Sequence, residues 1–162
     1  MCSIDGLRSV KDIFDCHKMS FINIMFVKVN LIDTLAHIDV IATYHFNIDH
    51  KNEKYKICHK IEQIIKKHNL SHVKREYVRS IGNGLRYGKC PIKCSVYVGK
   101  NKRSVIVIHD SGKGFDHQDI VKKFHKGAKY YQRGGCGFKS LSHDNVKVDW
   151  DDNGRKIILY YQ

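Results

Sequence analysis

The stretch SVIVIHDSGKGFD, residues 104–116, is the part of the sequence that decides the expected fold. Its first six residues are rich in β-branched side chains and predict a strand. Asp110 then stands at a strand end, where a carboxylate can accept hydrogen bonds from an amine such as the exocyclic group of adenine. Gly112 and Gly114 permit positive φ and close backbone approach to a ligand. The alternative is an ordinary turn, because Asp and Gly are the usual turn residues.

A second glycine-rich stretch, RGGCGFKSL, covers residues 133–141 and opens an apolar segment. Such a loop can deliver backbone N–H groups to phosphate at a helix N-terminus. It is not a P-loop, because Gly-Lys-Ser/Thr is absent, and no Rossmann fingerprint opens a βαβ unit. The stretch therefore indicates a phosphate-binding loop of another kind.

A helix is expected over residues 72–87, before both glycine stretches. Val73, Tyr77, Ile81 and Leu85 form one helical stripe, and Asn83 lies on a different face. The usual interpretation of such an asparagine is a solvated surface residue. The order of the three motifs favours a ligand-binding interpretation instead.

This order resembles the ATP-binding fold of the histidine kinase-like (GHKL) ATPase superfamily, which includes gyrase-type enzymes and heat-shock chaperone ATPases. Within it, the chain is most similar to the anti-sigma factor serine kinases. Residues 83–88 resemble the family's Asn-Ala-x-x-His-Gly, residues 110–116 its Asp-x-Gly-x-Gly-Phe-Asp, and residues 134–138 its Gly-Gly-x-Gly-Leu. The resemblance covers residues 38–162 as one ATP-binding domain. It leaves residues 1–37 as an N-terminal extension of uncertain structure, either an added helix and strand packed on the core or sequence upstream of an internal start at Met19 or Met25.

The resemblance implies that Mg²⁺ and ATP are the cofactors. Asn83 would coordinate the Mg²⁺ that bridges the phosphates, and Asp110 would read the adenine. The basic segment 122–133 would form a lid over the nucleotide, although a solvated basic loop is its alternative interpretation. The remaining implied cofactor-binding residues are Gly112, Gly114, Gly134, Gly135, Gly137 and Phe138.

The chain departs from the family where phosphoryl transfer would be catalysed. The family's general base, a Glu one turn before the Asn, is Arg79 here. Arginine stays protonated and cannot abstract a proton, so no catalytic residue is assigned. Glu76 lies about a further turn away and is expected to be a solvated partner of Arg79. A protein that binds nucleotide and catalyses serine phosphorylation weakly, if at all, is the expected result.

The order of elements predicts an α+β fold of the Bergerat type: a two-layer sandwich with a mixed, mostly antiparallel sheet and helices on one face. Strands are expected at 39–48, 92–98 and 104–109, a helix at 53–68, and a short helix around Val121 and Phe124. Asp116 and Asp119 suit the first turn of that short helix. Asn153-Gly154 between two alternating runs predicts a final hairpin.

Composition limits the class of protein. The six cysteines form no C-x-x-C pair and no secretory signal precedes them, which predicts reduced thiols and a cytoplasmic protein. The apolar run 21–31 is about half of what a bilayer span requires, so no membrane segment is expected.

The formal net charge of +13 points to an anionic partner. One interpretation is a protein partner such as a sigma factor or its antagonist, bound in a nucleotide-dependent way, with a homodimer open because the resembled family commonly dimerises. The alternative is a nucleic-acid-binding protein on a degenerate ATP-binding scaffold, with Tyr87, Tyr130 and Tyr131 available for stacking. Against that alternative, basic residues are spread along the sequence and no nucleic-acid motif is present.

Overall fold

A computed structural model describes residues 31–126, 128, 141 and 146–162 of the chain. The second glycine stretch, with Gly134, Gly135, Gly137 and Phe138, and most of the expected lid lie outside the described residues. Short 3-10 helices occupy Lys51–Glu53 and Lys100–Lys102. The longer elements are, in chain order, α2 Leu31–Ile38, β1 Val40–Ile48, α3 Lys54–Lys67, α4 Glu76–Tyr87, β2 Ile92–Gly99, β3 Ser104–His109, α5 His117–His125, β4 Val146–Asp151 and β5 Lys156–Tyr161.

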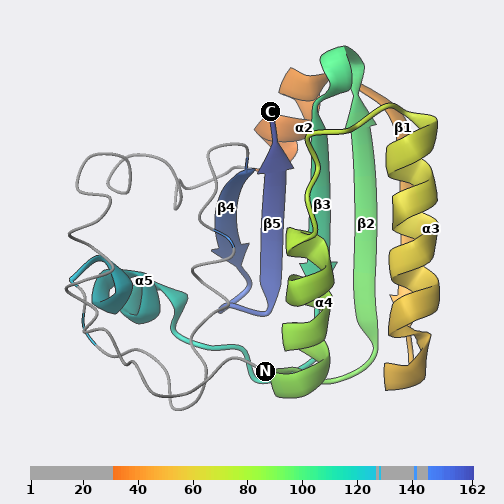
Figure 1. Cartoon of the computed structure of the whole chain (residues 1–162). Coiled ribbons are helices and arrows are strands. Elements are labelled where there is room, and N and C mark those ends of the chain that lie inside the picture. Colours follow the sequence, from red (N-terminus) through yellow and green to blue (C-terminus); the bar gives the residue numbers. More distant parts are fainter. Residues whose placement is uncertain (1–30, 127, 129–140, 142–145) are drawn as a thin grey trace, which may run out of the picture.

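The strands form one sheet in the order β1-β2-β3-β5-β4, and α3 and α4 lie side by side on one face of it (Figure 1). Among the described strands every neighbouring pair is antiparallel, so the α+β fold is confirmed, and these strands contain no parallel pair of the expected mixed, mostly antiparallel sheet. The connection from β1 to β2 explains this. It makes two helical passes in opposite directions, which return the chain to the end of the sheet where β1 left it, and β2 must then run antiparallel to β1.

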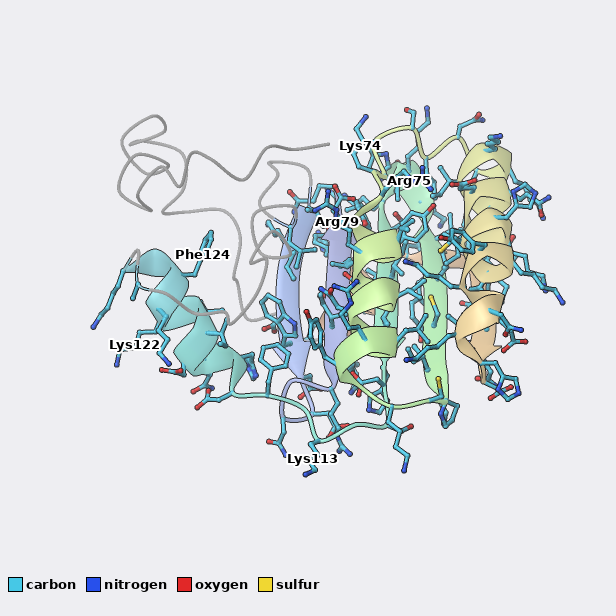
Figure 2. The ribbon with its side chains drawn as sticks, turned by 60° about the horizontal axis from the view of Figure 1, so that its bottom comes forward. Lys74, Arg75, Arg79, Lys113, Lys122 and Phe124 are labelled. Atoms are coloured by element: carbon cyan, nitrogen blue, oxygen red, sulfur yellow. The ribbon has the colours of Figure 1, made fainter. Side chains whose placement is uncertain are left out.

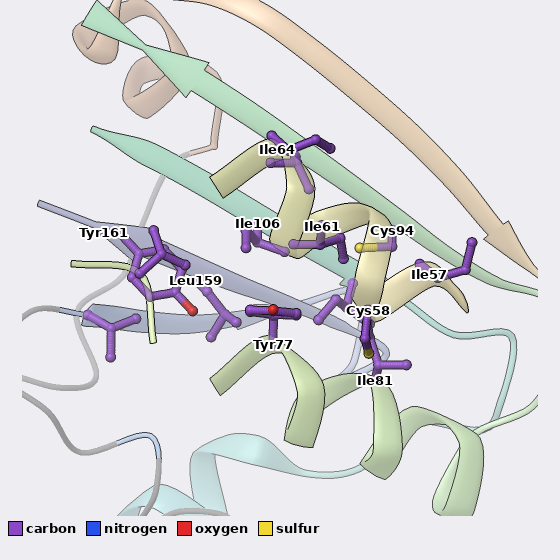
Figure 3. Packing of buried hydrophobic residues seen from close by; sticks show 14 of the residues in the cluster. Ile57, Cys58, Ile61, Ile64, Tyr77, Ile81, Cys94, Ile106, Leu159 and Tyr161 are labelled. Carbon is purple, nitrogen blue, oxygen red and sulfur yellow. The ribbon is translucent and has the colours of Figure 1, made fainter. Parts of the chain in front are cut away.

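The main core lies between the sheet and the two helices α3 and α4 (Figure 3). Ile57, Ile61 and Ile64 of α3 recur at helical spacing and are buried, as are Tyr77 and Ile81 of α4. The sheet contributes alternate residues of each strand to the same core, among them Cys94, Ile106, Leu159 and Tyr161. Burial raises the pKa of the Cys94 thiol to about 12, so this cysteine behaves as a small apolar side chain.

A second, smaller core lies on the opposite face of the sheet. Leu31, Leu35 and Ile38 of α2 pack there against the intervening residues of β3 and β5, namely Val105, Val107, Ile158 and Tyr160. The expectation that helices cover one face only is therefore wrong. The reason is visible in β3, whose residues Ser104 to Ile108 are all buried: a strand that is apolar on both sides needs cover on both faces.

Most of the expected elements are confirmed, and the largest difference is in the helix that carries Asn83. That helix begins at Glu76, whereas the stripe from Val73 predicted a start at residue 72. Val73 is buried all the same, because the connecting turn before α4 packs on the core. The hairpin around Asn153-Gly154 is present, with positive φ at Asp152, Asn153 and Gly154. The side chain of Asp116 caps α5 by accepting a hydrogen bond from the N–H of Asp119 at 2.9 Å, as expected.

Candidate functional site

The turn that follows β3 folds directly against the C-terminal end of α4. A Cβ on Gly88 would lie 2.4 Å from Cγ of Asp110, and one on Gly112 would lie 2.8 Å from Cα of Gly88. No side chain fits at either position, so glycine is required there. We call the residues Asn83, Gly84, Gly88, Asp110 and Gly112 the α4–β3 junction. The motif at residues 83–88 and the motif at residues 110–116 thus meet in space.

Asp110 lies at this junction as a partly buried carboxylate. Its Oδ1 accepts a hydrogen bond from the N–H of Gly112 at 2.7 Å, and its own N–H donates to the carbonyl of Arg155 at 3.0 Å. Among the described residues, none donates a hydrogen bond to its Oδ2. One oxygen of Asp110 is therefore fixed by the turn, and the other remains an acceptor for a ligand.

Gly114 joins the same turn to the hairpin between β4 and β5. Its φ is +74°, and a Cβ there would lie 2.1 Å from the carbonyl oxygen of Asn153. The N–H of Phe115 donates to that same oxygen at 2.9 Å. Positive φ is thus confirmed for Gly114, while Gly112 is required by close packing alone. In both cases the close neighbour is the protein's own backbone, which agrees with the alternative interpretation of an ordinary turn as well as with a ligand site.

Asn83 is exposed on the side of α4 that looks toward β5. Gly82 faces α3, since its Cβ would lie 2.9 Å from Nζ of Lys54. Asn83 is about 100° further round the helix, and Glu76, about two turns earlier, lies on the same side of α4 as Asn83. Glu76 accepts a hydrogen bond from Tyr161 of β5, so this side of α4 faces β5. Asn83 and Asp110 therefore sit on neighbouring elements, with the side chain of Asn83 open to solvent or ligand.

The expectation that Glu76 is a solvated partner of Arg79 is wrong. Glu76 is 4% exposed, and its Oε2 accepts a hydrogen bond from the hydroxyl of Tyr161 at 3.1 Å. Burial and the Glu76 carboxylate hold the pKa of Tyr161 well above its usual value, so the hydroxyl remains a donor. No signal in the sequence identifies this pair, because Tyr161 is contributed by the last strand, 85 positions away.

Replacing Tyr161 with phenylalanine should expose how much this pair contributes to the fold. We expect the free energy of unfolding to fall by about 1–3 kcal/mol, because a buried carboxylate loses its donor. Urea denaturation measures the change. Tyr160→Phe is the matched control, since Tyr160 is also buried in the same strand and its hydroxyl has no hydrogen bond to a described residue. Equal losses in both variants would contradict the role given to the Glu76–Tyr161 pair.

Arg79, at the position of the family's general base, is exposed on α4 close to Lys74 and Arg75 (Figure 2). It forms no ion pair with any described residue. With Arg79 permanently charged and Glu76 engaged by Tyr161, α4 offers no general base on this flank.

A polar anchor that the sequence did not predict holds the far side of the turn. Nε2 of His109 lies 2.7 Å from Oδ2 of Asp152, and the guanidinium of Arg155 bonds Oδ1 of the same carboxylate. The hydrogen bond from Arg155, with a smaller effect of His109, lowers the pKa of Asp152. Asp152 therefore stays ionised and links His109, at the end of β3, to the β4–β5 hairpin. This link also fixes the position of Asp110, which follows His109 in the sequence.

An aromatic cluster flanks the same turn. The ring of His117 stacks on that of Trp150 with centroids 6.3 Å apart, and Phe115 meets Trp150 edge-on at 6.2 Å. Trp150 is the single tryptophan of the chain. Its fluorescence can therefore report on events at residues 110–117.

The metal ligands are few in the described part of the structure. Residues 31–126, 128, 141 and 146–162 contain no group of three or more His, Cys, Asp or Glu that could hold a metal ion. A Mg²⁺ at Asn83 would accordingly take most of its oxygen ligands from phosphate and water, which is how Mg²⁺ is usually held beside nucleotides.

Comparison with known proteins does not identify a family for this chain. No protein family, curated protein sequence or solved structure matches the chain. Among the helices of the described segments, none is both long enough and apolar enough to cross a membrane.

Proposed function

We propose that the chain binds Mg-ATP at the α4–β3 junction, in an ATP-binding fold of the Bergerat type. The observation that carries the proposal is the direct contact of Gly88 and Gly112 beside Asp110, which unites two motifs from distant parts of the sequence. Asp110 would accept the adenine amine on its second oxygen, and the amide oxygen of Asn83 would bind Mg²⁺. Gly134, Gly135, Gly137 and Phe138 would complete the site from the segment outside the described residues.

The role of the bound nucleotide is to control association with a partner, and not rapid phosphoryl transfer. Support comes from α4, where Arg79 cannot act as a general base and Glu76 is buried against Tyr161. The chain would then act as a cytoplasmic regulator of the anti-sigma type. Its partner would be a sigma factor, or the antagonist of one, held when ATP is bound. Serine kinase activity is the weaker alternative, and it would be seen as transfer of the γ-phosphate to such a partner.

Changing Asp110 to asparagine separates a nucleotide site from a simple turn. Asparagine keeps an oxygen for the N–H of Gly112 but places an amide donor against the adenine amine. We expect Mg-ATP affinity to fall by at least about tenfold, while the melting temperature stays within a few degrees of wild type.

Binding measured by titration and unfolding measured by scanning fluorimetry together test this. Asp49→Asn, an exposed carboxylate just beyond the end of β1, is the matched control and should bind normally. If Asp110→Asn loses affinity and thermal stability together, Asp110 is a turn residue and its assigned role in reading adenine fails.

A further inference from the structure

Positive charge is concentrated in the helical layer, which we define as residues 51–89, including α3 and α4. This quarter of the chain contains eleven of the 29 Lys and Arg residues but only three Glu and no Asp. In the sequence these cations look dispersed. Because α3 and α4 lie side by side on one face of the sheet, the fold gathers them on one side of the molecule.

The three glutamates of the layer are each already engaged. Oε2 of Glu53 accepts hydrogen bonds from the N–H groups of Asp49 and His50, at 2.8 and 3.0 Å. Glu62 lies 3.5 Å from the guanidinium of Arg75, and Glu76 is buried. The structure describes all of residues 51–89, and in this segment none of the three glutamates forms an ion pair with a lysine. The positive charge of the lysines is therefore available to a partner.

A stripe of lysines runs along the outer side of α3. Lys56, Lys60 and Lys67 recur at spacings of four and seven and extend over roughly 16 Å of helix. The ammonium groups of Lys60 and Lys67 each lie 5.9 Å from a ring centroid, over Phe46 and Tyr44 respectively. These contacts hold both cations beside the edge strand β1 without neutralising them.

A second group of cations lies at the start of the neighbouring helix, α4. Figure 2 shows Lys74, Arg75 and Arg79 gathered at the N-terminal end of α4. Lys66, Lys67 and Lys74 form no ion pair with any described residue, so the charge of this end of the layer is also uncompensated. The layer therefore carries Lys56, Lys60 and Lys67 along α3 and a second group, Lys74, Arg75 and Arg79, at the N-terminal end of α4, with hardly any exposed carboxylate.

We propose that the helical layer binds the phosphate backbone of a duplex nucleic acid, independently of Mg-ATP at the α4–β3 junction. Lysines on one helix face that form no ion pair with a carboxylate of the described residues suit a polyanion such as a phosphate backbone. A protein interface would instead need a buried apolar centre, and the large exposed apolar side chains of the layer are confined to Tyr55 and Tyr87. Base stacking requires a row of aromatic rings, so contacts with backbone phosphates are favoured over contacts with unpaired bases.

Fluorescence anisotropy with a labelled 24-base-pair duplex of mixed sequence tests the proposal on the full chain. Wild type should bind, and its affinity should fall steeply between about 50 and 200 mM salt. The triple variant Lys56→Gln, Lys60→Gln, Lys67→Gln should lose at least about tenfold in affinity and show a salt slope lower by about 0.9 for each phosphate that the protein no longer neutralises. An unlabelled duplex of different sequence should compete equally well.

The matched control is Lys93→Gln, Lys100→Gln, Lys147→Gln, which removes the same number of charges from outside the layer and outside the segment 122–133. It should bind within about twofold of wild type, and both triple variants should melt as wild type does because the substituted side chains are not buried. Equal losses in the two triple variants would overturn the assignment to the layer. Binding to vesicles containing phosphatidylserine, or to an acidic polypeptide, without binding to the duplex would overturn the choice of nucleic acid.

Discussion

Replacing Asn83 with alanine should reduce the affinity for Mg-ATP by at least about 100-fold, as expected when a metal site loses its protein oxygen ligand. The exposed position of Asn83 on the β5 side of α4 means that the change removes no core packing. ATP binding in the presence of EDTA should be affected much less, because the adenine contact at Asp110 remains. The fluorescence of Trp150, next to Phe115 and His117, provides the readout.

Asn52→Ala is the matched control for this substitution. Asn52 is also an exposed asparagine, in the short 3-10 helix before α3 and away from the junction, and its removal should leave Mg-ATP affinity unchanged. Asn83→Ala should also unfold at the same urea concentration as wild type. An unchanged affinity for Mg-ATP in a folded Asn83→Ala protein would remove the metal-binding role of α4 from the account.

Replacing Ile61 with alanine should produce a large loss of stability. Ile61 is 0% exposed and packs at the centre of α3 against the sheet (Figure 3). We expect a loss of about 2–5 kcal/mol, from the transfer free energy of the removed methyl groups and the cavity that they leave. This is a large share of the about 5–15 kcal/mol that stabilises a domain of this size.

Ile41→Ala tests whether that loss comes from burial. Ile41 is 57% exposed in β1, so its truncation should cost no more than about 1 kcal/mol, chiefly through β-propensity. Urea denaturation of both variants gives the comparison. If the two variants unfold at a similar urea concentration, α3 contributes little to the core. The packing of α3 on the sheet would then be contradicted.

Short sequence patterns correctly predicted several helices, strands and turns. The β-branched run before Asp110 became β3, the helix expected at 53–68 became α3, and Asn153-Gly154 closed the expected hairpin. In each case the periodicity of the side chains and the preferences of the turn residues agree, which is why a short window of sequence was sufficient.

Features that depend on contacts between distant segments could not be predicted in this way. Glu76 looked like a surface residue because its partner, Tyr161, is supplied by the last strand. That α2 covers the second face of β3 could not be decided, since one apolar strand does not reveal which segment packs on it. The contact of Gly88 with Asp110 is likewise a tertiary fact: spacing suggested that the two motifs belong together, but only the fold brings them into contact.

The positively charged surface of the helical layer could not be predicted from the sequence either. Along the sequence, Lys56 and Arg79 lie 23 positions apart, in two different helices. In the fold, α3 and α4 carry both of them in one layer. Which cations form a surface is decided by the direction in which each helix turns its apolar stripe, and that direction is known only once the core is assembled.

Isothermal titration of Mg-ATP into the full wild-type chain tests the central claim most directly. The account predicts saturable binding at one site per chain, with weaker binding when EDTA removes the metal and weaker binding still when GTP replaces ATP, because Asp110 would then face a carbonyl instead of an amine. No binding of Mg-ATP, or equal binding of ATP and GTP, would contradict a nucleotide site built on Asn83 and Asp110.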